Sequence, residues 1–264
     1  MEEKNKRFGD LKEFQKSNLR NITHLQLDLG NKIKGDEGAK DLGISLSKCT
    51  ELTNLIIYIY MNEIKNEGAQ AFGLALGSCK KLIDCKLWIY ENQIGDIGAS
   101  GIAAGLSNFT QITSLGLSLL KNEIGDEGIF DIGLALSKCK NLINLQLWLH
   151  TNQFGDKGLS GLLIGLNSCN QIKDLGLSLS KNKITDEGYL KMDECLSSLV
   201  NLTSLLCVFN DNEKLLKSRE MLNCKNVQVL ILIYNLCSSE EEHNKHYIKA
   251  LKIKRLVKLS SVQI

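Results

Sequence analysis

The sequence lacks several features that would point directly to a class of protein. Its 264 residues include no proline, only two tryptophans and only four arginines. No apolar run reaches the ~18 residues needed to span a bilayer, and the chain does not open with the pattern of a signal peptide. We therefore expect a soluble, unsecreted, cytoplasmic protein, and the absence of proline is typical of a chain with few loops.

A large charge of one sign is also absent, since 32 basic and 30 acidic residues leave a net charge of +2. Nucleic acids and membrane surfaces are bound by fields of one sign, so we expect neither as a partner. The lysines within residues 252–258 are interpreted as a solvated face, with an acidic partner as the alternative.

Nine cysteines are present, but no two have the Cys-x-x-Cys spacing of a zinc site. Five follow a helical segment at the same place in a repeated pattern: Cys49, Cys79, Cys139, Cys169 and Cys224. Phe109 and Leu199 fill that place elsewhere, which identifies a buried apolar position. We expect buried, reduced thiols and neither a metal nor another cofactor.

The dominant feature present is a short sequence that returns every 30 residues, best seen as Asn122-Glu-Ile-Gly-Asp-Glu-Gly128. Its asparagine stands at positions 62, 92, 122, 152, 182 and 212, and Asn31 opens an earlier copy with one extra residue. Repeats of this length indicate a solenoid, a propeller or an array. Some features return after 60 residues, such as Leu87-Trp88 and Leu147-Trp148, which suggests units that multiplied as pairs.

Each unit has two halves with different periods. Strict alternation, as in Leu115-Gly-Leu-Ser-Leu119, predicts a half-buried strand. Apolar residues at helical spacing, as in Leu159, Leu162, Leu163 and Leu166, predict an amphipathic helix. Strands are predicted in one parallel sheet at 25–29, 55–59, 85–89, 115–119, 145–149, 175–179, 205–209 and 230–233.

Two polar positions of the unit have structural interpretations. The repeated asparagine is predicted to be buried and to hydrogen-bond the backbone of the turn. The residue before each helix is interpreted as that helix's own N-cap, and these are Asp36, Asn66, Asp96, Asp126, Asp156 and Asp186. The Gly-Asp-x-Gly sequence lacks the spacing of a phosphate or calcium loop and is interpreted as a tight turn.

The pattern Leu-x-x-Leu-x-Leu, followed by Asn-x-Ile, Asp-Glu-Gly-Ala and a helix, resembles the leucine-rich repeats of the ribonuclease-inhibitor type. The asparagine lies two residues later than in the usual pattern. An insertion of two residues keeps each side chain on the same face of the strand, so we predict a longer strand. The resemblance implies a right-handed α/β solenoid shaped as a horseshoe arc, with a parallel sheet on the concave side and helices on the convex side. Stacked units of this kind bury a core that one unit cannot bury alone.

We expect three parts along the chain. Residues 1–18 are predicted to form an N-terminal cap, with a frayed start and a short helix around Leu11 and Phe14. Residues 19–235 form the solenoid of about seven to eight repeats. Residues 236–264 form a C-terminal cap with an acidic loop at 238–244, a helix at 247–254 and a strand at 256–262.

Residues between the core leucines of each strand must face the concave side. The candidate partner-binding residues on that side are Tyr58, Tyr60, Lys86, Trp88, Tyr90, Leu120, Gln146, Trp148 and His150. Trp88 and Trp148 flank a strand of small residues and are predicted to form a slot about 10 Å wide. The alternative is that a terminal segment or a neighbouring side chain covers these aromatics. His150 is interpreted as a polar edge of the patch, and Phe130 with Leu190 as a second contact on the convex side.

The sequence shows no Ser/His/Asp arrangement, no carboxylate pair in a common pocket and no nucleotide motif. We therefore expect a non-enzymatic protein-binding scaffold, and such repeat proteins include subunits of large assemblies, among them ciliary ones. The alternative, implied by the same resemblance, is a regulator of an enzyme, acting as a nuclease inhibitor or an activator of a GTPase. All four arginines lie outside or at the ends of the main repeats, which argues against an arginine finger.

Overall fold

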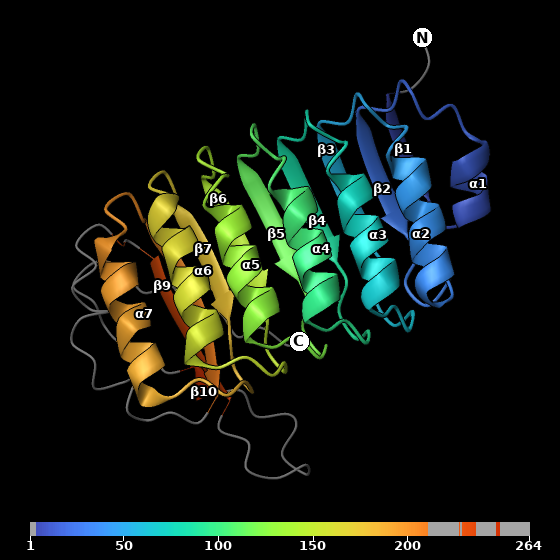
Figure 1. Cartoon of the computed structure of the whole chain (residues 1–264). Coiled ribbons are helices and arrows are strands. Elements are labelled where there is room, and N and C mark those ends of the chain that lie inside the picture. Colours follow the sequence, from blue (N-terminus) through green and yellow to red (C-terminus); the bar gives the residue numbers. More distant parts are fainter. Residues whose placement is uncertain (1–3, 211–226, 228, 236–246, 249–264) are drawn as a thin grey trace.

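The computed structural model describes residues 4–210, 227, 229–235 and 247–248, which fold as one stack of strand–helix units (Figure 1). The strands of this described part form one sheet in chain order, from β1 to β10. Neighbours are parallel from β1 to β9, and β10 pairs with β9 in the antiparallel sense. Parallel neighbours require a crossover, and in each crossover that the structure describes a helix provides it with the usual right hand.

The strands are β1 (Asn5–Phe8), β2 (His24–Asp28), β3 (Asn54–Tyr58), β4 (Asp84–Trp88), β5 (Ser114–Ser118), β6 (Asn144–Trp148), β7 (Asp174–Ser178), β8 (Ser204–Asn210), β9 (Val229–Asn235) and β10 (Tyr247–Ile248). The helices are α1 (Leu11–Lys16), α2 (Gly35–Leu46), α3 (Asn66–Leu76), α4 (Asp96–Leu106), α5 (Asp126–Leu136), α6 (Asp156–Ser168) and α7 (Asp186–Ser198). Strands β2 to β8 begin one residue earlier than predicted, and their parallel pairing is confirmed.

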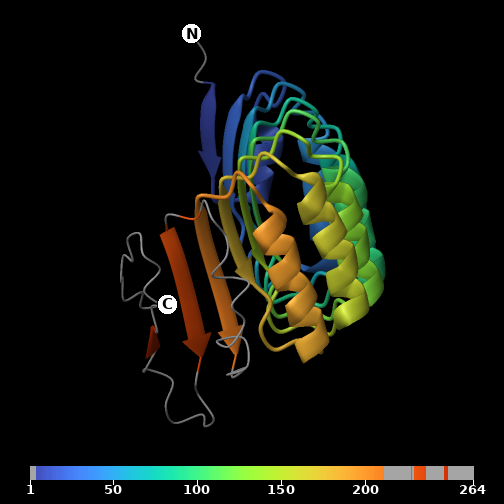
Figure 2. The same ribbon diagram turned by 90° about the vertical axis from the view of Figure 1, so that its left-hand side faces the viewer.

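The sheet forms one layer and the helices α2 to α7 stand side by side in the other (Figure 2). Helices pack at roughly 8–10 Å and strands at about 4.8 Å, so the sheet takes the concave side and the helices the convex side. This is the α/β leucine-rich-repeat solenoid that the sequence predicts. One continuous core lies between the layers, and its apolar residues repeat from unit to unit, as at Leu55, Cys85, Leu115 and Leu145.

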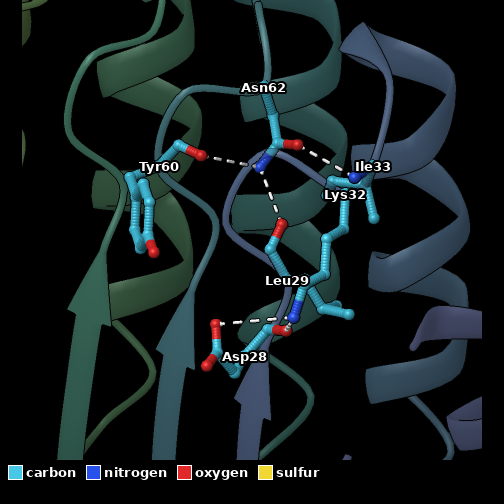
Figure 3. A network of polar contacts seen from close by, with 6 residues as sticks. All are labelled: Asp28, Leu29, Lys32, Ile33, Tyr60 and Asn62. Atoms are coloured by element: carbon cyan, nitrogen blue, oxygen red, sulfur yellow. Dashed lines mark hydrogen bonds and ion pairs between the residues drawn. The ribbon is translucent and has the colours of Figure 1, made fainter. Parts of the chain in front are cut away.

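The repeated asparagines hydrogen-bond the backbone of the turns, as predicted, and together they form a row from unit to unit that we call the asparagine ladder. Figure 3 shows its first member, Asn62. The side-chain oxygen of Asn62 accepts from the backbone N–H of Ile33 in the preceding unit at 2.9 Å. Its amide donates to the carbonyls of Leu29 and Tyr60, each at 3.0 Å. Asn92, Asn122, Asn152 and Asn182 repeat this arrangement, each joining the turn of its own unit to the preceding one.

The first unit departs from the ladder because of its extra residue. The register of β2 with β3 places Lys32, and not Asn31, level with Asn62. The Lys32 ammonium donates to the carbonyl of Asp28 at 2.8 Å and lies 3.9 Å from its carboxylate (Figure 3). Asn31 is exposed, so the ladder begins at Asn62 within the described residues.

The interpretation of the aspartates as N-caps of their own helices is wrong. Each of these residues from 66 to 186 is the first residue of its helix, Asp36 is the second residue of α2, and the true N-cap residues make no side-chain capping bond. Instead, the Asp96 carboxylate accepts from the N–H groups of Gly125 and Gly128 at the start of the next helix, at 2.7 and 2.9 Å. Asn66 and Asp126 do the same for both N–H groups of their successors, and Asp36 and Asp156 accept from the first of the two, at Lys65 and Thr185. The capping group is thus supplied by the neighbouring unit.

This arrangement explains the glycine two residues after each of these aspartates. A Cβ on Gly128 would lie 2.8 Å from the Asp96 carboxylate, and one on Gly68 would lie 2.4 Å from that of Asp36. The Asp-x-Gly sequence therefore serves two neighbours, because its aspartate caps the next helix and its glycine admits the carboxylate from the previous unit.

A second set of glycines brings certain helices into close contact. A Cβ on Gly73 would lie 2.4 Å from the carbonyl oxygen of Gly101, and one on Gly133 only 2.1 Å from that of Gly161. Both contacts join a helix to its successor, α3 to α4 and α5 to α6, and they lie 60 residues apart. The paired period seen in the sequence therefore has a counterpart in the helix layer.

The cysteines of the repeated position are buried, as predicted. The thiols of Cys79, Cys139 and Cys169 point to carbonyl oxygens of the preceding unit at 3.6, 3.7 and 3.2 Å. Burial raises the pKa of Cys49, Cys79 and Cys139 to about 12, so these thiols stay protonated at neutral pH. Cys224 lies outside the described residues.

The N-terminal end of the described chain differs in part from what the sequence predicts. Residues 5–7, predicted to be frayed, belong to β1, which pairs with β2. The predicted short helix is present as α1, and the rings of Phe8 and Phe14 lie 5.4 Å apart over the first unit. The single apolar residue Phe8 was too weak a signal to predict a strand.

At the C-terminal end, Tyr247 and Ile248 form β10 rather than the start of a helix. The predicted loop at 238–244, the remainder of the helix, the strand at 256–262 and Asn212 lie outside the described residues. The basic residues at 252–258 lie there too. The division into a cap, a solenoid and a second cap stays a prediction.

Candidate functional site

The concave face is set by alternation along each strand. Leu87 and Ile89 are buried in the core, while Trp88 between them is only partly buried. The same holds for Trp148 between Leu147 and Leu149, so the predicted facing is confirmed. All nine candidate residues lie on this face.

The backbone extends the concave face beyond the regular strands. The N–H of Ile59 donates to the carbonyl of Trp88 at 2.9 Å, and that of Glu91 donates to the carbonyl of Leu120 at 3.0 Å. This pairing continues the strand-like spacing for two residues, which is the lengthening that the displaced asparagine predicts. It adds an outer row to the face, formed by Tyr60, Tyr90, Leu120 and His150.

Four of the candidates form two stacked pairs, which we call the aromatic patch: Tyr58 with Trp88 and Tyr60 with Tyr90. The first pair has ring centroids 6.3 Å apart and planes within 9°, and the second 4.8 Å and 7°. A Cβ on Gly30 would lie 2.3 Å from the Tyr60 ring, so this glycine gives the ring its place. Burial, then Tyr60 and Glu91, raise the pKa of the Tyr90 hydroxyl, which is therefore neutral at physiological pH.

The slot predicted between the two tryptophans is closed. Ser118 pairs with Trp88 on one side and Trp148 on the other, and it is 0% exposed. Its hydroxyl and both indole N–H groups are buried without a hydrogen-bond partner. Since each tryptophan is partly exposed while its N–H is buried, the surface it presents is carbon. The two side chains offer apolar area rather than a gap for insertion.

His150 forms a polar border to this surface. Its Nδ1 lies 2.9 Å from the hydroxyl of Ser178, and burial, followed by Lys181 and Lys121, lowers the pKa of the imidazole. Ser178 is 1% exposed, so its hydroxyl is inaccessible to a substrate. The pair therefore fits the interpretation of a polar edge.

Long and small residues alternate on the inner row of the face. A Cβ on Gly116 would lie 3.4 Å from Lys86, and one on Gly176 would lie 3.4 Å from Gln146. Both long side chains therefore lean over a glycine of the next strand. The structure brings Tyr58 onto Trp88 and Tyr60 onto Tyr90. It leaves Trp148 and His150 two strands away.

The sequence reading missed part of the concave face at its N-terminal end. A hollow of about 370 Å³ lies there, and its lining includes Arg7, His24, Gln26, Asn54 and Ile56. It exists because β1 continues the sheet, and β1 was not predicted. The predicted contact at Phe130 has a structural explanation, since a Cβ on Gly161 would lie 2.4 Å from its ring. Leu190, by contrast, is 55% exposed.

Among the described residues, no three His, Cys, Asp or Glu side chains are arranged to hold a metal ion. In the same part of the chain, no helix has both the length and the apolar character to cross a membrane.

Comparison with known proteins identifies the repeat directly. The family described as "Leucine Rich repeat" matches residues 177–192, from the end of β7 into α7. None of the curated proteins matches the chain.

Two internalins of Listeria monocytogenes are similar in structure. Internalin InlF is 19% identical with a TM-score of 0.40, over 88% of this chain and 65% of the internalin. Internalin C2 is 20% identical with a TM-score of 0.46, over 84% of this chain and 90% of the internalin. The chain thus spans 65% of the length of InlF. Similarity at this level bears on neither partner nor activity, and the ribonuclease-inhibitor subtype stays a prediction.

Proposed function

We propose that this protein is a non-enzymatic scaffold whose concave face binds a protein partner. The anchors are the aromatic patch and Trp148, and the surrounding contacts are Lys86, Leu120, Gln146 and His150. The supporting observation is the pair of aromatic stacks on the solvent side of the sheet, where the core does not require them.

The stacks suit binding for an energetic reason. Each ring is already held by its neighbour, so little side-chain entropy remains to be lost when a partner docks. Tyrosine and tryptophan are also the residues most enriched in the energetic centres of protein interfaces. The carbon surface of Trp88 and Trp148 then supplies apolar contact, and the hydroxyls of Tyr58 and Tyr60 supply polar contact at its margin.

The test is affinity capture from the source cells with wild-type protein and with the variant Trp88→Ala/Trp148→Ala. We expect the variant to lose the partner, with binding weakened by about 2 kcal/mol or more. Val200→Ala is the control, since this side chain is exposed in the turn between α7 and β8 and is none of the candidate residues. Full capture by the tryptophan variant, with the control unchanged, would move the interface away from the concave face.

A captured partner also decides the alternative function. If the protein regulates an enzyme, adding it to the purified partner should change that partner's GTP hydrolysis or nuclease activity. An inert partner would favour a passive subunit of a larger assembly, such as a ciliary complex. We propose a cytoplasmic location, which localisation experiments would test.

A further inference from the structure

A second surface lies on the convex side, where one exposed position repeats as an aliphatic residue. We call it the convex stripe: Ile44, Leu74, Ala104, Leu134 and Ile164, one from each of α2 to α6. Its four large side chains are 57%, 57%, 41% and 50% exposed, in chain order. In α7 the same position is Glu194, where the stripe ends.

The fold does not need these side chains. In α2 the core is served by Leu42 and Leu46, and Ile44 lies about 200° around the helix from each of them. A single exposed leucine is ordinary. Four at the same position of five successive helices, with Ala104 as the one small residue between them, form a row that the core does not account for.

The spacing of the stripe selects the kind of partner. Neighbouring helices lie roughly 8–10 Å apart, so the stripe offers one apolar contact at about that interval. Seven residues of an α-helix rise about 10.5 Å and return to the same face, which matches the interval. Three residues of a β-strand also rise about 10 Å, but residues three apart point to opposite faces.

Charged residues on the two sides of the stripe differ in sign, which would orient a bound helix about its long axis. Lys48 and Lys138 are exposed one turn beyond it, toward the C-terminal ends of the helices. Glu37, Glu67 and Glu127 are exposed two turns before it, and Lys40 partly neutralises the first two. In α6 that position is the exposed Lys157. A helix lying along the stripe would therefore have an acidic surface along one edge from α2 to α5 and a basic one along the other.

We propose that the convex stripe binds an amphipathic helix of a partner protein that lies across α2 to α6. Its apolar residues repeat every seven positions, its edge toward Lys48 and Lys138 is acidic, and its opposite edge is basic. The first residue of each heptad contacts the stripe, and the fourth falls into the groove between two helices. The protein then joins two partners, one on each face.

The probe is a labelled peptide of four heptads, about 42 Å long when helical. It carries leucine at the first and fourth positions, glutamate on one edge and lysine on the other. Fluorescence anisotropy with the full chain measures its binding. We expect Leu74→Gln/Leu134→Gln to weaken binding more than tenfold, and Ala104→Leu to tighten it at least threefold by filling the gap in the stripe.

Three controls make the outcome decisive. Val200→Gln changes an exposed apolar side chain in the turn between α7 and β8, outside the stripe, and should change binding less than twofold. A peptide of the same composition without the heptad order should bind at least tenfold more weakly. Thermal unfolding checks that the variants remain folded, which is expected because these side chains are exposed.

Equal binding of the ordered and scrambled peptides, or of the stripe variant and wild type, would overturn the proposal. So would dimerisation of the protein that the stripe variant abolishes, because the stripe would then belong to a second copy. Failure of this test leaves the concave proposal intact, since that one depends on Trp88 and Trp148.

Discussion

Two regions of the molecule differ in how much their residues change from one unit to the next. They are the seams, meaning the polar positions that bond one unit to its neighbour, and the concave face. At the seams the same residues return every 30 positions, as with Asn92 and Asn122 or Asp96 and Asp126, and each bonds backbone groups of a neighbouring unit. On the concave face, one level of the sheet reads Tyr58, Trp88, Ser118, Trp148 and Ser178. Internal repetition of the seam residues therefore marks what the stack requires, and variation on the concave face marks positions that the stack leaves free to vary.

The convex stripe falls in neither group, since it repeats and yet is exposed. Repetition of a buried position follows from stacking, whereas repetition of an exposed apolar one requires another cause. A partner that itself repeats, as a helix does, provides one.

The contrast should be sharpest for the glycines. Gly133→Ala should destabilise the protein by about 3 kcal/mol, because the new methyl group would overlap the backbone of α6. Gly116→Ala on the concave face should stay within about 0.5 kcal/mol, since its nearest neighbour is a flexible lysine chain at an ordinary distance. Chemical denaturation of both variants measures their free energies of unfolding. A loss for Gly133→Ala as small as that for Gly116→Ala would show that the helices of this layer can move apart without cost.

Removal of an asparagine from the ladder should have the next largest effect. Asn122→Ala leaves the N–H of Ile94 without its side-chain acceptor and removes one of the two amide donors from the carbonyls of Ile89 and Leu119, so we expect a loss of about 2 kcal/mol. Asn141 also bonds a carbonyl of the preceding unit but is exposed, and Asn141→Ala should cost well under 1 kcal/mol. An unchanged unfolding curve for Asn122→Ala would contradict the ladder as a stabilising device.

The neighbour-supplied caps should have a smaller effect. Asp96→Ala leaves two N–H groups at the start of α5 without their acceptor, which should cost about 1 kcal/mol. Asp96→Asn should retain most of the stability, because Asn66 performs this task one unit earlier with an amide oxygen. If the amide variant loses as much as the alanine variant, the negative charge and not the hydrogen bond is what stabilises the helix start.

The concave tryptophans should matter least for stability. Trp148→Ala should change the free energy of unfolding by less than about 1 kcal/mol, because this side chain faces solvent beside Ser118. Trp88→Ala should cost slightly more, since it also loses its stack with Tyr58. Thermal unfolding of both variants measures the difference, and a loss as large as that for Asn122→Ala would make the tryptophans part of the core.

The concave site was predictable in part because facing is a local property. Alternation around Leu87 and Ile89 is enough to place Trp88 on the solvent side, with no knowledge of other strands. The closed slot was not predictable, since it depends on how two large rings fill the space over Ser118 from both sides. Side-chain conformations of this kind are settled by packing and carry no periodic signal.

The sequence by itself determined the unit, the order of strand and helix, and which positions are buried, because all three follow from spacing along the chain. The tertiary structure alone decided what each unit gives to the next. Asp96 and Gly128 lie 32 residues apart, and only the register of the stack shows that the carboxylate caps the following helix rather than its own. The same holds for Gly133 and Gly161, whose contact depends on how closely α5 and α6 pack. Spacing along the chain determines whether a residue is buried and in which element it lies. The packing of neighbouring units determines which group it bonds or contacts.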